Sequence, residues 1–189
     1  MNPELSNDCN WPGSDQLMRR YHDEEWGVPL HNDQKIFEFM VLDAFQAGLS
    51  WKTVLHKREN FGRAFDNFNY CLIAEYTEEK IQELMQDVSI IRNQAKIRTT
   101  VTNAKAFIKV QLEFGSFDHY IWQFTGGKTI ENQFSFSHEI PARSAESDAM
   151  SKDLTSRGFK FVGSTICYAF MQAAGMVNDH LLTCSKRRV

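Results

Sequence analysis

The sequence predicts an all-α fold, and three observations support this prediction. Apolar residues recur at helical spacing in several separate segments. Most of these segments begin at an Asn, Asp, Ser or Thr that can cap a helix. The least helical part of the chain is confined to one stretch, residues 125–141, which could form a hairpin or an irregular loop.

The first strongly patterned segment covers residues 34–48, where Asn32 or Asp33 can cap a helix. Apolar residues nearly encircle this segment, which predicts a helix inside the core. A second helix is expected after Thr77, because the two glutamates that follow it favour a helix N-terminus. Its apolar positions at i, i+3, i+4 and i+7 spacing are Ile81, Leu84, Met85 and Val88.

Three further helices follow by the same reasoning. One begins after residues 89–94, and its apolar stripe is formed by Ile97, Val101, Ala104 and Ile108. Another runs from a cap at Ser144 or Ser147 through Leu154. The last is a buried helix from Thr165 to about Gly175, where the glycine favours a C-terminal end.

The composition indicates one unit with a sizeable core. The chain has 189 residues, of which 42% are hydrophobic and 13% aromatic. Its net charge of −3 does not predict a polyanion-binding surface over the whole molecule. No apolar run approaches the length of a membrane span and the N-terminus has no signal pattern, so we expect a cytoplasmic protein without a membrane partner. Four cysteines are too few for a disulfide framework, which leaves reduced thiols or metal ligands.

Two Cys/His pairs stand near the two ends of the chain, Cys9 with His22 and His180 with Cys184. The second pair is four residues apart, which on a helix places both side chains on one face. Together the four residues supply the thiolates and imidazoles that zinc binds in a tetrahedron, and a complete set of protein ligands indicates a structural ion. The alternative is that both cysteines are small buried residues and the histidines are solvated.

One stretch of the chain is basic although the net charge of the whole chain is nearly neutral. No acidic residue occurs between Val88 and Leu112, and the same stretch contains Arg92, Lys96, Arg98, Lys105 and Lys109. It covers a helix end, a short connection and the start of the next helix, where backbone N–H groups can bind a phosphate. A solvated basic face is the alternative.

The third group of residues combines one carboxylate with several aromatic rings. Asp43 lies inside the otherwise apolar first helix, where a carboxylate is costly unless it is paired or functional. Trp51 follows that helix, and Trp11, Tyr21 and Trp26 surround the first Cys/His pair in the sequence. Flat aromatic faces and one carboxylate suit a flat cation. Ordinary core packing and a partnered carboxylate at the edge of the core are the alternatives.

Several long motifs resemble those of the 3-methyladenine DNA glycosylase I family. They are YHDEEWGVP (21–29), QAGLSW (46–51), VLHKREN (54–60), IIRNQAKI (90–97) and RGFKFVGSTICYAFMQAAGMVNDH (157–180), together with the Cys/His pairs. The resemblance runs from about residue 9 to residue 184, nearly the whole chain. Because the motifs are long and keep their order, chance similarity does not explain them.

The resemblance implies a helix-hairpin-helix DNA glycosylase fold made by a single unit, 1–189. Its hairpin motif is expected at about 78–110, and a zinc-stapled lobe is expected from about 9–30 and 160–184. The family's zinc ligands, for one structural Zn²⁺ per chain, fall on Cys9, His22, His180 and Cys184. The family's base pocket falls on Tyr21, Asp43 and Trp51, with Trp11 nearby. Contacts with the DNA backbone are expected at Ser89, Arg92, Lys96 and Arg98.

The chain departs from the family pattern at two pocket positions. The family's pocket carboxylate is usually glutamate, and here it is Asp43, which is one methylene shorter. A tyrosine often stands three residues before Tyr21, and here that position is Met18.

The implied activity is base-excision repair by a monomer that removes 3-methyladenine from double-stranded DNA. Methylation at N3 makes adenine cationic and a good leaving group, so the enzyme must mainly flip out the nucleotide and hold it. No aspartate occurs between Asp87 and Asp118, as in this family, so we expect hydrolysis by water without a lysine intermediate. Asp43 would accept hydrogen bonds from the base, while Tyr21 and Trp51 stack on it. The alternative is a non-enzymatic, zinc-stapled DNA-binding protein with a degenerate pocket; the signatures of a zinc deaminase are absent.

Overall fold

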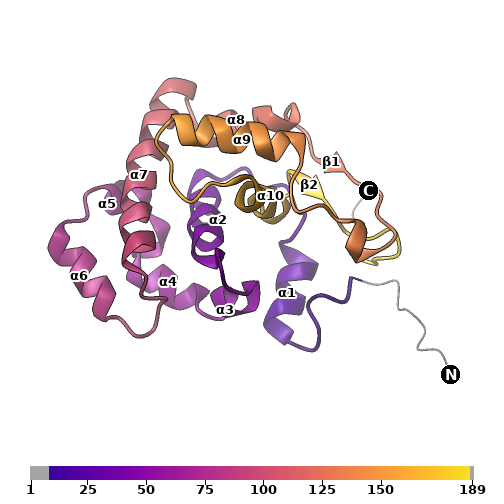
Figure 1. The fold of residues 1–189 in the computed structure, drawn as a ribbon, viewed down its shortest axis with the longest axis horizontal. Helices are drawn as coiled ribbons and strands as arrows, with labels where there is room; N and C mark the ends of the chain where they lie inside the picture. The colour runs from indigo at the N-terminus through magenta and orange to yellow at the C-terminus, as the bar shows by residue number, and fades with distance from the viewer. Residues whose placement is uncertain (1–8, 188–189) are drawn as a thin grey trace.

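The structure is built mainly from helices, as predicted (Figure 1). The computed structural model describes residues 9–187. Its elements are α1 (Gln16–Glu24), α2 (Asp33–Gln46), α3 (Trp51–Leu55), α4 (Arg58–Ala64), η1 (Asp66–Phe68), α5 (Tyr70–Ala74), α6 (Glu78–Gln86), α7 (Gln94–Phe114), α8 (Phe117–Trp122), η2 (Gln123–Thr125), β1 (Ile130–Glu131), η3 (Ser137–Glu139), α9 (Ala145–Ser156), α10 (Ser164–Ala173) and β2 (Val177–Asn178). None of the helices in this range is long and apolar enough to cross a membrane.

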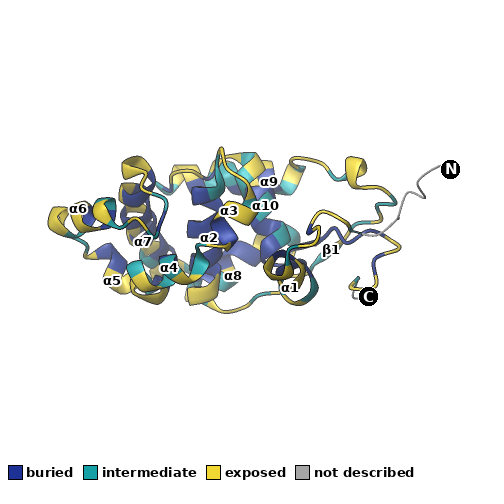
Figure 2. Cartoon of the chain, turned by 90° about the horizontal axis from the view of Figure 1, so that it is seen from below, coloured by how far each residue is buried: buried dark blue, intermediate teal, exposed yellow. Residues whose placement is uncertain are grey.

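Helix α2 lies at the centre of the core. Asn32 caps it by accepting a hydrogen bond from the backbone amide of Lys35. Every residue from Ile36 to Phe45 is buried, which confirms the core position predicted from its encircling apolar pattern. Figure 1 shows α7 and α10 on opposite sides of α2, and in Figure 2 the buried residues gather around it. Asp43 is therefore placed inside the core.

The other predicted helices are confirmed, with one correction. Thr77 caps α6, and Ser144 caps α9, each by accepting a hydrogen bond from a backbone amide. Helix α7 carries the predicted apolar stripe, and α10 ends before Gly175. The prediction that Val88 belongs to the buried stripe of α6 is wrong, because the helix ends at Gln86 and the Val88 side chain is 74% exposed.

Residues 125–141 form neither a hairpin nor a wholly irregular loop. Strand β1 pairs in parallel with β2, with Ile130 opposite Val177 and Glu131 opposite Asn178. A parallel partner must come from a distant part of the chain, so a local sequence pattern cannot reveal it. The pairing brings this stretch against the C-terminal segment.

Gly175 allows the end of α10 to pack directly on the segment that follows α1. Its φ is +66°, and a Cβ there would lie 2.2 Å from the carbonyl carbon of Val28. On either side of this contact, the amide of Gly27 donates to Gln172 O and that of Leu30 donates to Ala174 O. Helix α1 and strand β2 therefore lie on the same side of the molecule (Figure 1).

Candidate active site and metal centre

All residues predicted for a base pocket line one cavity of about 340 Å³. Its wall is formed by Trp11, Tyr21, Trp26, Asp43, Gln46, Trp51, Ser137, Ile140, Ala169 and Gln172. These residues come from α1 and the segments on either side of it, from α2, α3 and α10, and from the segment around η3. Sequence reasoning singled out the aromatic residues and the carboxylate. It missed the remaining wall residues, which are small, aliphatic or neutral polar and have no chemical signature of their own.

Asp43 is buried without the partner that a structural carboxylate would have. Its side chain is 4% exposed, and Oδ2 has no hydrogen-bond partner among the described residues. The same is true of Trp51 Nε1, and within residues 9–187 these are the only buried side-chain nitrogen or oxygen atoms without a partner. An unpaired acceptor and an unpaired donor thus line the same cavity, and such groups are costly unless a ligand satisfies them.

Burial also changes the acid–base behaviour of the cavity. Desolvation raises the pKa of the Asp43 carboxyl well above its usual value, because the surroundings disfavour a charge. Burial likewise raises the pKa of Tyr21, and the neighbouring Asp43 adds to that effect, so the phenol stays protonated. A cation in the cavity would act in the opposite direction on Asp43, since an opposite charge favours the carboxylate.

The aromatic rings stand next to one another around the carboxylate. The ring centres of Tyr21 and Trp51 are 5.0 Å apart at an interplanar angle of 48°. Trp11 meets Tyr21 edge-on at 6.2 Å and Trp26 edge-on at 5.3 Å. Trp11 is 39% exposed whereas Tyr21 is 3% exposed, so the aromatic wall runs from the surface to the interior. This arrangement offers ring faces to a flat ligand.

Gln172 connects this wall with the C-terminal segment. Its Nε2 donates to Oδ2 of Asp179 at 2.8 Å, and the hydroxyl of Tyr168 donates to the same oxygen at 2.9 Å. Asn132 Nδ2 donates to the other oxygen, Oδ1, at 2.7 Å. Asp179 is fully buried, so its three hydrogen bonds fix both the position of Gln172 and the start of the turn that contains His180.

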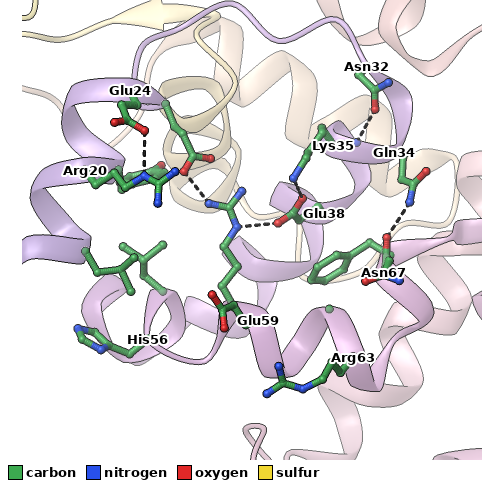
Figure 3. Close-up of a pocket in the computed structure, with 17 residues that line it drawn as sticks. Arg20, Glu24, Asn32, Gln34, Lys35, Glu38, His56, Glu59, Arg63 and Asn67 are labelled. Atoms are coloured by element: carbon green, nitrogen blue, oxygen red, sulfur yellow. Dashed lines mark hydrogen bonds and ion pairs between the residues drawn. The ribbon is translucent and has the colours of Figure 1, made fainter.

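A larger groove of about 1220 Å³ lies between α1, α2 and α4 (Figure 3). Several of its charged groups are ion-paired with one another. Arg58 donates to Glu38 at 2.6 Å and to Glu25 at 2.8 Å, and Lys35 donates to Glu38 at 2.7 Å. These partners satisfy one another and tie α1, α2 and α4 together. Glu59 and Arg63 also line the groove, and neither forms an ion pair among residues 9–187.

The second candidate site is a cluster made by Cys9, His22, His180 and Cys184. Their ligand atoms all lie within 4.8 Å of one another and are buried. His180 Nδ1 is 3.3 Å from Cys184 Sγ and 4.0 Å from Cys9 Sγ, and Cys184 Sγ is 3.7 Å from His22 Nε2. A tetrahedral ion with bonds of about 2.0–2.3 Å needs ligand atoms roughly 3.3–3.8 Å apart. The cluster could therefore hold one metal ion.

Both histidines have a partner for the nitrogen that faces away from the cluster. His22 Nδ1 lies 2.7 Å from Asp23 Oδ1, and His180 Nε2 lies 3.1 Å from Trp26 O. Such contacts fix the tautomer and leave the other nitrogen free to bind a metal. Burial lowers the pKa of His180 to about 4, which keeps its ring neutral. Trp26 also lines the cavity, so the cluster and the cavity share a wall.

His180 and Cys184 do not lie on a helix. Strand β2 ends at Asn178 and a turn follows, in which the amide of Cys184 donates to Leu181 O at 2.8 Å. The turn, rather than a helix face, brings the second Cys/His pair together. The amide of Leu181 also donates to Cys9 Sγ at 3.2 Å, which attaches the N-terminal thiol to the same turn.

The basic residues between α6 and α7 do not form a uniform surface. Arg92 is exposed and forms no ion pair within the described residues. Ser89 lies in the connecting segment, where its carbonyl accepts hydrogen bonds from Lys57 at 2.8 Å and Asn60 at 3.2 Å. Arg98 is ion-paired through both terminal nitrogens with Glu78 of α6. Of the predicted basic contacts, Arg92 is therefore the most available to a DNA phosphate.

Lys96 has a different environment from the one expected. Lys96 is 6% exposed, and its Nζ donates hydrogen bonds to Phe45 O at 2.9 Å and to Ala47 O at 2.6 Å. The ammonium group therefore binds the last carbonyls of α2, where a positive charge is favourable. This geometry does not support a direct phosphate contact, and it makes Lys96 a link between the start of α7 and the helix that carries Asp43.

Comparisons with known proteins agree on one relationship. The family model described as Methyladenine glycosylase matches residues 11–188. The chain is 45% identical to DNA-3-methyladenine glycosylase 1 of Escherichia coli (strain K12), over 93% of this chain and 94% of that protein. The structure of 3-methyladenine DNA glycosylase I from Staphylococcus aureus, solved to explain 3-methyladenine recognition, has a TM-score of 0.94 at 31% identity and covers 97% of both chains. A variant of 3-methyladenine DNA glycosylase I in complex with 3-methyladenine also has a TM-score of 0.94 at 31% identity, covering 97% of this chain and 98% of that one.

Proposed function

Because the chain belongs to the methyladenine glycosylase family, we propose that it is a base-excision repair enzyme that hydrolyses the N-glycosidic bond of 3-methyladenine in alkylated DNA. The observation that carries this proposal is the cavity with an unpaired acceptor, Asp43 Oδ2, and an unpaired donor, Trp51 Nε1. An extruded purine would satisfy both groups, and its ring would lie among the aromatic side chains. We further propose that a single unit acts as a monomer on double-stranded DNA in the cytoplasm.

The pKa of Asp43 explains how the site could favour a damaged base over normal adenine. In the empty cavity, burial favours the protonated, neutral carboxyl. A base methylated at N3 is cationic, so it stabilises the carboxylate and draws the proton off Asp43. Neutral adenine lacks this attraction. The cationic base is also a good leaving group, so positioning it and admitting water to the sugar is the main task of the protein.

We propose that the cluster of Cys9, His22, His180 and Cys184 holds one zinc ion with a structural role. Thiolates and imidazoles in a 2:2 ratio at these separations suit zinc, and four protein ligands leave no position for an activated water. The ion would fix Cys9 and His22 to the C-terminal turn. It would thereby support α1, which places Tyr21 in the cavity, without taking part in the reaction.

We propose that α6, the connection at 87–93 and α7 form a helix-hairpin-helix motif that binds the DNA backbone. The connection is short and its backbone is held by Lys57 and Asn60. Arg92 projects from it, and the first turn of α7 contains no acidic residue. Free amides at a helix N-terminus together with an exposed arginine suit a phosphate. Ser89 would contribute through its backbone, whereas Lys96 and Arg98 would position the motif.

The test is release of free 3-methyladenine from a methylated duplex, with the base identified by chromatography. The wild-type protein should release 3-methyladenine, and Asp43→Asn should do so about 10- to 150-fold more slowly, which corresponds to the loss of a charge-assisted hydrogen bond of about 1.5–3 kcal/mol. Asp118→Asn, a carboxylate on α8 that pairs with His31, is the matched control and should leave the rate unchanged. Wild-type protein that binds methylated DNA but releases no base would refute the proposed activity and favour a non-enzymatic binding protein.

A further inference from the structure

Phe161 has a backbone conformation that is unusual for an aromatic residue. Its φ of +53° lies in the left-handed region, which is costly for a bulky side chain. The residue is nevertheless 37% exposed, so deep burial of the ring does not offset the cost. Residues held in such conformations concentrate at functional sites. The proposed reaction, however, assigns no role to Phe161.

The backbone around Phe161 is held firmly on both sides. Phe159 and Val162 are buried and anchor the segment in the core. Asn103 of α7 forms a pair of hydrogen bonds with the backbone of Lys160, because its Nδ2 donates to Lys160 O at 3.0 Å and its Oδ1 accepts from Lys160 N at 2.9 Å. The surrounding structure therefore imposes the left-handed conformation and directs the ring outward.

The ring lies beside the end of α2 that leads into the cavity. Lys96 Nζ is 6.0 Å from the centre of the Phe161 ring, and the same ammonium group binds Phe45 O and Ala47 O. The chain continues from Ala47 past the exposed side chain of Leu49 to Trp51 in the cavity wall. Phe161 is thus close to the segment that joins Asp43 and Trp51.

A second connection leads to the cavity through α10. Cys167 Sγ donates to Val162 O at 3.2 Å, next to Phe161. Burial raises the pKa of Cys167 to about 12, and the proximity of Asp43 contributes to this rise. Two residues further along, Ala169 lines the cavity. Helix α10 therefore connects the segment that carries Phe161 with the wall of the cavity that contains Asp43.

We propose that Phe161 is a stacking platform for a DNA base next to the flipped nucleotide. This proposal rests on the proposed function. Once a nucleotide has left the duplex, the neighbouring bases lose a stacking partner, and an exposed aromatic ring held in a fixed orientation can replace it. The charges favour DNA as the occupant, because residues 157–163 contain no acidic residue and the exposed Lys160, next to Phe161, forms no ion pair among the described residues.

The test uses a duplex with a tetrahydrofuran abasic-site analogue, which the enzyme cannot cleave. 2-Aminopurine is placed opposite the analogue, or on its 5′ or 3′ side, in three separate duplexes. Stacking on Phe161 should quench its emission in at least one of these duplexes when wild-type protein binds. Phe161→Ala should abolish that quenching and weaken binding about 5- to 150-fold, which is the range for loss of one base–aromatic stack. Phe161→Trp should retain both.

Two further variants separate stacking from a structural role. Phe161→Gly removes the ring but relieves the left-handed strain, so it should keep the thermal stability of the wild type while losing the quenching. Leu112→Ala removes an 82% exposed apolar side chain from the far end of α7 and should change neither property. Unchanged quenching and affinity in Phe161→Ala, alongside normal excision, would overturn this proposal and leave the proposed function intact. Wild-type protein that neither binds the duplex nor excises a base would overturn both.

Discussion

Replacing Asp43 by asparagine should make the protein more stable at neutral pH although it makes the enzyme slower. The carboxyl group is buried with Oδ2 unpaired, and this burial raises its pKa. An acid with a raised pKa in the folded state favours folding most at pH values below its unfolded-state pKa, which is about 3.9 for aspartate. That contribution is lost as the pH rises toward the folded-state pKa. Asparagine does not ionise, so the stability of the variant does not change with pH through this position.

The size of the effect follows from proton linkage. Between the two pKa values, the wild type loses up to about 1.4 kcal/mol of unfolding free energy per pH unit relative to the variant. Since 1 kcal/mol shifts the Tm of a domain of this size by about 2–4 °C, the Tm advantage of Asp43→Asn should grow by up to about 3–6 °C for each pH unit between the two pKa values.

The assay is a series of thermal unfolding scans from pH 4 to pH 7 on both proteins. Because both contain the same Cys/His cluster, any loss of metal at low pH affects them equally. Asp15→Asn is the control of opposite sign, since hydrogen bonds from Lys52 and the Met18 amide lower the pKa of Asp15. That variant should be less stable than the wild type at pH 7, and the difference should shrink as the pH falls. Parallel Tm curves for wild type and Asp43→Asn would refute the reasoning, because they would mean that Asp43 has the same pKa in both states.

Three further predictions concern the proposed metal centre and the proposed DNA-binding surface. Cys184→Ser should lower both the metal content, from about one equivalent per chain, and the Tm; full content and stability in the variant would make the ligand assignment wrong. Arg92→Ala should weaken binding to damaged and undamaged DNA alike and reduce the slope of log K against log salt by about one unit, and an unchanged slope would move the backbone contact elsewhere. Lys96→Met should lower the Tm, because it removes two hydrogen bonds to the end of α2, but it should leave the salt slope of DNA binding unchanged. A slope reduced as in Arg92→Ala would mean that Lys96 does contact a phosphate.

The sequence predicts the residues with distinctive chemistry better than it predicts their surroundings. Asp43 was recognisable because a carboxylate interrupts an otherwise apolar helix, and the aromatic residues were recognisable as a group. By contrast, Ala169 and Gln172 reach the cavity only because α10 packs on α2, a tertiary relationship that no local pattern contains. The parallel pairing of β1 with β2 was hidden for the same reason.

Lys96 illustrates a different limit of sequence reasoning. Charge patterns treat all lysines in a basic stretch alike, and an acid-free segment suggests a surface for phosphate. The direction of each side chain depends on what lies beside it after folding. Here the free carbonyls at the end of α2 lie beside the first turn of α7, so this lysine points inward whereas Arg92 remains at the surface. Both residues carry the same charge, yet their expected roles differ.

The position of the Cys/His cluster has a consequence for the biosynthesis of the protein. Cys9 and His180 are 171 positions apart, so a ribosome must complete nearly the whole chain before the cluster can close. At about 5–20 residues per second, Cys9 and His22 wait roughly 10–30 s as an incomplete site in the nascent chain. Their thiol and imidazole are exposed to oxidants and competing metals during that interval, whereas the ligand atoms in the folded protein are buried. Oxidative stress should therefore inactivate newly made molecules before it affects those that have already folded.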